Sequence, residues 1–321
     1  KKFVSLKKNF KNETLLKLID QKIKQIPLLN KKNQFIDLVG HDFSLNKEYN
    51  IYKARTPVRI SFSGGGSDFS NYFMKYSGSC LTSAISLYSY ATLTKRGDHK
   101  IIINSLNPKL QLEYENINKI KYNGKLDIVK GVINILKPQF GFNLEIRSDF
   151  PISSGLGGSS SLISSIIGVF NEYNNRKIDK YTMSEISIQI ERLELGIKGG
   201  WQDQYSTIFG GFNLIEFNSR ENLVTPLKLD SDKILELQER LILCHTKSKH
   251  LGEEIQKVNS KKNLSKLDLS NLNKIKKLTN QMKKYLLLGE FSKFGNLLDT
   301  SWHLKKTNNN NVSNKFIDKI Y

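Results

Sequence analysis

A glycine- and serine-rich segment at residues 151–161 constrains the fold of this chain more than any other feature. It reads Pro-Ile-Ser-Ser-Gly-Leu-Gly-Gly-Ser-Ser-Ser. In front of it Phe142, Leu144 and Ile146 occupy alternate positions, which predicts a strand, and behind it residues 162–170 carry an apolar stripe at helical spacing. A glycine loop between a strand and a helix exposes successive backbone N–H groups at the positive end of the helix dipole. The segment therefore predicts a binding site for a polyphosphate.

Two common phosphate-binding patterns do not fit this segment. No Gly-Lys-Ser/Thr follows the loop, as a Walker A sequence requires, and the glycine spacing is poor for a dinucleotide fingerprint. Serine hydroxyls in the loop can still donate hydrogen bonds to a phosphate or coordinate Mg²⁺. The alternative is a purely structural turn, in which small residues let a strand pass tightly into a helix.

A second glycine segment, Gly-Gly-Gly-Ser-Asp at residues 64–68, follows a predicted strand at residues 54–62. The three glycines open space beside the backbone, and the serine and aspartate that follow can bind substrate hydroxyls. Arg55 and Arg59 lie on the predicted strand and supply positive charge for a phosphate. The alternative is a glycine turn flanked by surface arginines.

A third segment, residues 196–204, follows a predicted helix at residues 182–195 and contains an aspartate just after a glycine turn. Such an aspartate, Asp203, can accept the proton of a substrate hydroxyl or polarise that hydroxyl. An aspartate in a turn is also a common local cap. Glu191, on the predicted helix, is a candidate carboxylate for a metal ion. The alternative for Glu191 is a solvated helix face, because other glutamates lie nearby.

The charge and the cysteines narrow the class of protein. The chain has 321 residues, a length that favours two domains, and 50 Lys+Arg against 30 Asp+Glu give it a net charge of +20. This charge suits a nucleic acid, an anionic membrane or acidic small molecules, although much of it lies in Lys- and Asn-rich stretches typical of solvated faces. Two cysteines cannot form a disulfide framework, so we expect a reducing cytoplasm. The apolar runs are too short to span a membrane.

Residues 1–51 differ from the rest of the chain. Residues 15–26 have helical spacing that Pro27 ends, and two short apolar runs surround a polar turn at residues 30–33. This pattern predicts one helix and a two-stranded unit. The stretch also resembles the hairpin end of a CBS-type regulatory repeat. We therefore expect an appended segment or part of a neighbouring domain here.

The three glycine segments, in this order, resemble the GHMP small-molecule kinase superfamily. The middle loop is similar to that family's Pro-x-x-x-Gly-Leu-Gly-Ser-Ser-Ala motif, with Gly158 and Ser161 as variants. Within the superfamily the chain most resembles the branch of D-glycero-D-manno-heptose 7-phosphate kinases. The stretches that carry this likeness are residues 55–68, 155–160, 202–213 and 302–306, and the resemblance covers about residues 52–321.

The resemblance implies an α+β fold with two lobes. Residues 52–215 would form an ATP- and substrate-binding lobe like domain 2 of ribosomal protein S5, and residues 216–321 a helix-rich, ferredoxin-like lobe. The implied activity is ATP- and Mg²⁺-dependent phosphorylation of the anomeric hydroxyl of a heptose 7-phosphate. Alternatives are another acceptor such as fucose, a catalytically inactive sensor, and, less favoured, a nucleic-acid-binding protein.

The resemblance also assigns roles to single residues. Asp203 matches the catalytic aspartate, and Arg55 an arginine that stabilises the transferring phosphate or the reacting oxygen. Ser159 and Glu191 match positions that hold Mg²⁺. The loop that binds the phosphates of ATP comprises Gly155, Leu156, Gly157, Gly158, Ser159 and Ser160. The residues matched to the acceptor site are Arg59, Gly65, Gly66, Ser67 and Asp68.

One family feature is missing. The third motif of the family, a Gly-Ala-Gly-rich loop near the C-terminus, has no counterpart here, since after Gly252 the only glycines are Gly289 and Gly295. We therefore expect an incomplete second lobe in a truncated chain. The expected partners are ATP and a sugar phosphate, with no nucleic acid and no membrane. A homodimer remains open.

Overall fold

The computed structural model describes residues 6–7, 25–29, 35–40, 51–244, 246, 264–308 and 312–321. The chain divides into two compact units, residues 1–49 and 50–321. Both lobes predicted from the sequence, residues 52–215 and 216–321, lie within the second unit. None of the helices in these ranges combines the length and the hydropathy needed to cross a bilayer.

The described residues of the first unit form three short strands. They are β1 (Leu6–Lys7), β2 (Gln25–Leu29) and β3 (Phe35–Gly40), and β2 pairs antiparallel with β3 and parallel with β1. The expected two-stranded unit is therefore present. The helix expected at residues 15–26 cannot include its last two residues, because Gln25 and Ile26 pair with Gly40 and Val39. The rest of that helix lies outside the described residues.

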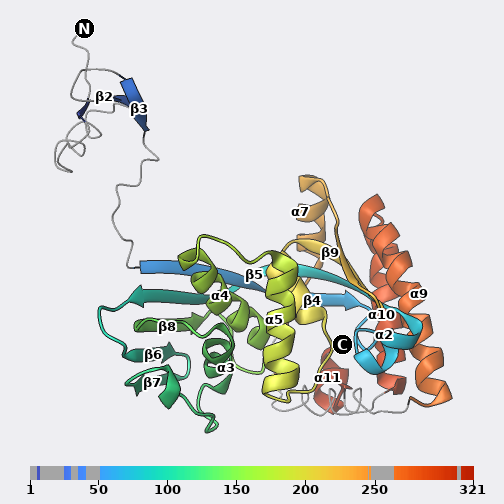
Figure 1. The fold of residues 1–321 in the computed structure, drawn as a ribbon. Coiled ribbons are helices and arrows are strands. Elements are labelled where there is room, and N and C mark those ends of the chain that lie inside the picture. The colour runs from blue at the N-terminus through green and yellow to red at the C-terminus, as the bar shows by residue number, and fades with distance from the viewer. Residues whose placement is uncertain are drawn as a thin grey trace. The chain divides into compact units, whose positions relative to one another are not determined.

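The second unit is built on a seven-stranded mixed sheet (Figure 1). Its longest strand, β5 (Gly78–Lys95), pairs antiparallel with β4 (Ile51–Ser63) along one side. On its other side β5 has two neighbours, β9 (Phe212–Phe217) along its first part and β8 (Phe142–Ser148) along its last part. These strands include the ones expected at residues 54–62 and 142–146.

The remaining strands extend the sheet at its two ends. Beyond β8 lie β6 (Ile101–Leu106), which runs parallel to it, and β7 (Lys109–Tyr114), which runs antiparallel to β6. Beyond β9 lies β10 (Asn222–Pro226). The lobe expected to be helix-rich, residues 216–321, therefore also contains the strand β10, because the chain continues the hairpin from β9.

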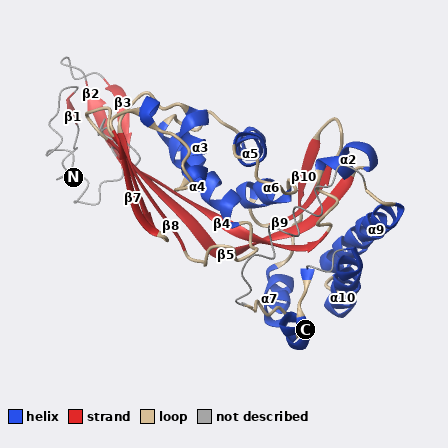
Figure 2. Ribbon diagram, turned by 90° about the horizontal axis from the view of Figure 1, so that it is seen from below, coloured by secondary structure: helices blue, strands red, loops and turns tan. Residues whose placement is uncertain are grey.

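Helices lie on both faces of the sheet (Figure 2). One face carries α3 (Asp127–Leu136), α4 (Gly158–Tyr173), α5 (Lys180–Ile188) and α6 (Gln202–Phe209). The other carries α7 (Ser231–Arg240), α9 (Lys266–Leu288) and α10 (Phe291–Asn308). Short helices are α2 (Ser70–Tyr76), the 3₁₀ turn η1 (Ile117–Lys119) and α11 (Lys315–Ile320). The α+β class expected from the sequence is confirmed.

Apolar clusters on both faces of the sheet hold these layers together. On the first face, the apolar stripe predicted for residues 162–170 is found on α4, whose Ile163, Ile166 and Ile167 are fully buried against β5, β6 and β8. On the second face, Phe62 and Leu81 from the sheet pack with apolar side chains of α9 and α10. The first core fixes α4, and therefore the glycine loop at its start, against the sheet.

Candidate active site

The predicted phosphate loop lies at the start of α4. Gly155 and Gly157 both have a φ of +74°, a conformation that L residues other than glycine rarely adopt. Gly157 caps the helix without a side-chain hydrogen bond, so the first N–H groups of α4 remain open to a ligand. The loop is anchored to the sheet, because Arg59 N donates to Leu156 O at 3.0 Å. This geometry is suited to an anionic group at the helix N-terminus.

Glu191 lies beside this loop because the helix before it changes its winding. The helix expected at residues 182–195 is α5 followed by a π-helical segment, η2 (Gln189–Glu194). Such segments are rare and concentrate at functional sites. Glu191 is 1% exposed, which excludes the solvated helix face considered above. Its carboxylate accepts from Ser159 Oγ at 2.5 Å and from Ser160 Oγ at 2.8 Å.

The group around Glu191 fits a magnesium ion that also binds nucleotide phosphates. Mg²⁺ prefers oxygen ligands and is usually held by one or two carboxylates together with substrate phosphates. Ser159 and Glu191 supply a hydroxyl and a carboxylate, in contact, at the N-terminus of α4. Gln204 Nε2 also donates to the Glu191 carboxylate and fixes its orientation. Within the described residues no group of three or more His, Cys, Asp or Glu could hold a metal alone, so phosphate oxygens would complete the ligand set.

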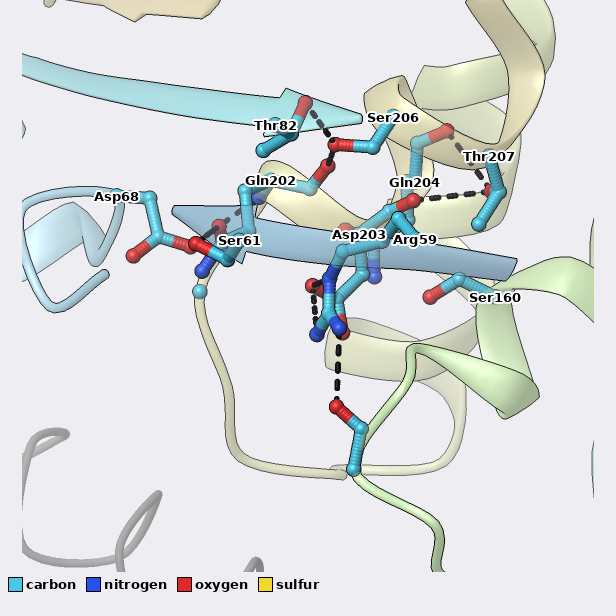
Figure 3. Close-up of polar contacts among 12 residues, drawn as sticks. Arg59, Ser61, Asp68, Thr82, Ser160, Gln202, Asp203, Gln204, Ser206 and Thr207 are labelled. Atoms are coloured by element: carbon cyan, nitrogen blue, oxygen red, sulfur yellow. Dashed lines mark hydrogen bonds and ion pairs between the residues drawn. The ribbon is translucent and has the colours of Figure 1, made fainter. Parts of the chain in front are cut away.

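Asp203, in the first turn of α6, forms an ion pair with Arg59. Arg59 Nε and Nη2 lie 2.8 Å and 2.7 Å from Asp203 Oδ1, and Arg59 Nη1 donates to Gly155 O at 2.9 Å (Figure 3). One guanidinium thus connects the aspartate to the phosphate loop. In the described part of the chain no donor binds Asp203 Oδ2, which lies 3.4 Å from the position of a Cβ built on Gly157. Oδ2 is therefore the oxygen that is available to a substrate.

Arg55 is not brought into this cluster. It is exposed, and its guanidinium lies 4.8 Å from the ring centre of Tyr88. The cause is an irregularity in the β4–β5 pairing between Pro57 and Val58. Before it the even positions of β4, such as Ala54, pack against α4, whereas after it the odd positions Arg59 and Ser61 bind residues of α6. Arg59 thus takes the place beside Asp203.

Asp68 lies on the other side of the Arg59–Asp203 pair from Ser160 (Figure 3). It is 1% exposed, and its carboxylate accepts from Gly66 N at 2.9 Å and from Gln202 N at 3.2 Å. Ser67, which was matched to the acceptor site, is fully buried instead. Its hydroxyl donates to Gly64 O at 2.8 Å, so it holds the turn rather than facing a ligand.

Other polar residues position the segment before α6. Arg192 donates to Ile197 O at 3.2 Å and to Gly200 O at 2.7 Å, which fixes the glycine turn. Gln202 accepts from Ser61 Oγ at 2.7 Å and attaches α6 to β4. Gln202 and Gln204 were not among the site residues predicted from the sequence, although they flank Asp203 in Gln-Asp-Gln.

Replacing Gly200 with alanine is expected to disturb Asp68. A Cβ at Gly200 would lie 1.9 Å from Asp68 Oδ2, a contact that must displace the carboxylate or the turn. Overpacking of this kind costs about 1–3 kcal/mol. We expect Gly200→Ala to lower the melting temperature and to raise the KM of the acceptor, measured by calorimetry and steady-state kinetics. Gly97→Ala is the matched control, because a Cβ there meets nothing within 4 Å. Equal behaviour of the two variants would contradict this account.

The protonation of Asp68 is expected to make stability depend on pH. Burial raises the pKa of Asp68 above its ordinary value of 3.8, and repulsion from Asp203 adds to the effect, while the backbone N–H groups oppose it. Between 3.8 and the raised pKa the folded chain holds a proton that the unfolded chain has lost, so the free energy of unfolding falls as pH rises through that interval.

We therefore expect the difference in melting temperature between wild type and Asp68→Asn to change with pH. Wild type gains stability relative to the variant as pH falls from neutral toward 3.8, the ordinary pKa, because only wild type can take up the proton. Scanning calorimetry over this range measures the difference. A constant difference would show that Asp68 titrates as it does in the unfolded chain.

Comparisons with known proteins agree with these features. Residues 127–211 match the GHMP kinases N terminal domain. The chain is 37% identical over 275 residues to a D-glycero-alpha-D-manno-heptose 7-phosphate kinase of Campylobacter jejuni, covering 84% of this chain and 81% of that protein.

Solved structures show the same likeness. A D-glycero-D-manno-heptose 1-phosphate kinase from Bacteroides thetaiotaomicron superposes with a TM-score of 0.69 and 29% identity, over 80% of this chain and 79% of that one. Lactococcus lactis galactokinase, solved with galactose, superposes with a TM-score of 0.63 and 23% identity, over 86% of this chain and 79% of that one. The galactokinase likeness extends to the fold alone.

Proposed function

The chain belongs to the GHMP kinase family, and from this premise we propose that it transfers the terminal phosphoryl group of ATP to the anomeric hydroxyl of a heptose 7-phosphate. The relatives that support a sugar kinase acting on a heptose phosphate match most of the chain. The observation that carries the proposal is the position of Asp203. Its carboxylate lies next to the phosphate loop through Arg59 and Gly155, and Asp68 lies on its other side.

The proposed mechanism follows from these contacts. The open N–H groups at the start of α4 bind the nucleotide phosphates, and Ser159 and Glu191 would hold Mg²⁺, which neutralises phosphate charge when bound. The sugar hydroxyl lies near Asp203 Oδ2, which takes its proton or polarises it. The sugar oxygen then bonds to the γ-phosphorus, the bond from that phosphorus to the bridging oxygen breaks, and ADP leaves. Arg59 keeps Asp203 oriented toward the loop.

The cellular setting is part of the proposal. Cys80, which is buried, and Cys244, which is exposed, are both free, and an unpaired exposed thiol suits a reducing compartment. We propose the cytoplasm, where ATP is available.

A direct assay tests the function. The protein is incubated with ATP, Mg²⁺ and, in separate reactions, heptose 7-phosphate, the unphosphorylated heptose and fucose, and the products are identified by phosphorus NMR. The expected result is ADP together with a sugar that carries phosphate on its anomeric oxygen, formed fastest from heptose 7-phosphate. Turnover with fucose and with neither heptose would show that the acceptor is fucose and not a heptose 7-phosphate. Thermal stabilisation by RNA but not by Mg-ATP would favour a nucleic-acid-binding protein instead.

A further inference from the structure

Lys305, on α10, brings a positive charge to the side of the site that contains Gly65 and Asp68, here called the acceptor side. A Cβ built on Gly65 would lie 3.9 Å from Lys305 Nζ and 3.5 Å from Gln202 Nε2. The ammonium group therefore lies over the second glycine segment, residues 64–68, and next to Gln202, the residue before Asp203. This lysine belongs to the face of the sheet opposite to α4, so its arrival at the site depends on the packing of α10.

No group of the described chain neutralises this ammonium by direct contact. Lys305 has no hydrogen bond and no ion pair in the described ranges, although Asp68 and Arg59 are near enough to act on it electrostatically. Its neighbour Lys306 differs, because Lys306 Nζ lies 2.6 Å from Asp318 Oδ1. Burial is the main cause that lowers the pKa of Lys305, and repulsion from Arg59 lowers it further. Cys80 and Asp68 act in the opposite direction and raise this pKa. A partly buried ammonium group that no carboxylate of the described residues contacts directly can bind an anion.

The position of Lys305 indicates which anion its ammonium group would bind. The open N–H groups that suit the nucleotide lie at the start of α4, near Ser160, whereas Asp68 lies on the opposite side of Asp203 (Figure 3). Lys305 lies with Gly65 and Asp68, on the acceptor side. Arg59, the other cation there, is already engaged by Asp203 and Gly155 O.

We propose that the Lys305 ammonium binds the phosphate group of the acceptor, and so selects a phosphorylated sugar over its unphosphorylated counterpart. This inference rests on the proposed function. Lys305 would act on binding of the acceptor and not on the transferred phosphoryl group, so its effect belongs in the KM of the acceptor. A desolvated charge pair of this kind has a large coupling energy, and removing one partner weakens binding strongly.

Kinetics of Lys305→Met test the proposal. We expect the KM for heptose 7-phosphate to rise by at least about 30-fold, which is about 2 kcal/mol at 1.4 kcal/mol per tenfold. The KM for ATP and the turnover of the unphosphorylated heptose should stay within about twofold. Lys305→Arg should recover much of the lost affinity, because it keeps the charge, and Lys306→Met is the matched control on the same helix.

Stability and selectivity separate this role from others. The melting temperature of Lys305→Met should equal or exceed that of wild type, because an unpaired ammonium is removed. An equal loss with both acceptors, a change confined to the KM of ATP, or a marked loss of stability would overturn the proposal. A wild-type protein that phosphorylates no sugar phosphate would instead overturn the proposed function itself, and with it this inference.

Discussion

Asp203→Asn should lower kcat by about 10²–10⁴-fold while the KM values for ATP and for the sugar phosphate change little. The range is that of a lost general base. The structure makes this variant a clean test, because both contacts from Arg59 go to Oδ1, and an amide oxygen can accept both. The charge of the ion pair is lost, but both Arg59 hydrogen bonds are kept, and an amide nitrogen in place of Oδ2, the oxygen without a donor from the described chain, cannot accept a proton.

The control for Asp203→Asn is Asp232→Asn. Asp232 lies in the first turn of α7, as Asp203 lies in the first turn of α6, but it is exposed, and α7 lies on the opposite face of the sheet from α4 (Figure 2). Steady-state kinetics and melting temperatures should show an inactive, folded Asp203→Asn protein and an unchanged control. A normal kcat in a folded Asp203→Asn protein would remove this aspartate from the mechanism.

Glu191→Gln should abolish most activity and shift the requirement for Mg²⁺ to higher concentration. Replacing a residue that merely orients a metal ligand lowers metal affinity or activity about 10–100-fold. We therefore expect loss of the carboxylate itself to lower kcat/KM at least about 100-fold at limiting Mg²⁺. The variant should also lose about 1–3 kcal/mol of stability, because a Gln amide nitrogen would face the donors that now bind the carboxylate. A magnesium titration of kcat/KM measures the first effect and calorimetry the second.

Two further variants show whether the effect of Glu191→Gln comes from the metal. Ser159→Ala removes only the hydroxyl and should shift the magnesium dependence in the same direction, by less. Glu194→Gln is the matched control, since Glu194 is on the same π-helical segment, is exposed and binds Tyr122. A Glu191→Gln protein that is destabilised but keeps the wild-type dependence on Mg²⁺ would assign Glu191 a structural role alone.

Local patterns were enough to predict much of the fold and part of the site. Alternation predicted the strand at residues 142–146, and helical spacing predicted the buried stripe of α4. Glycines with positive φ lie in all three glycine segments that the sequence marked. These features depend on neighbours along the chain, and so they can be read from it directly. The resemblance to the GHMP kinases was carried by the same glycine segments, and the comparisons with known proteins confirm it.

The tertiary structure decided which side chains meet. Nothing along strand β4 indicated that its alternation changes between Pro57 and Val58, and this change is why Arg59 and not Arg55 lies beside Asp203. The contact of Glu191 with Ser159 depends on a π-helical segment that helical spacing does not reveal.

The same division applies to the acceptor side. The sequence marked Asp68 by its glycines, but only the packing of α10 on the sheet brings Lys305 to Gly65. By itself the sequence determined which segments form strands, helices and glycine loops, because periodicity and glycines act through local backbone preferences. Only the tertiary structure decided which charged side chains meet, because contacts between them join residues far apart in sequence and form only when the sheet and the helices pack.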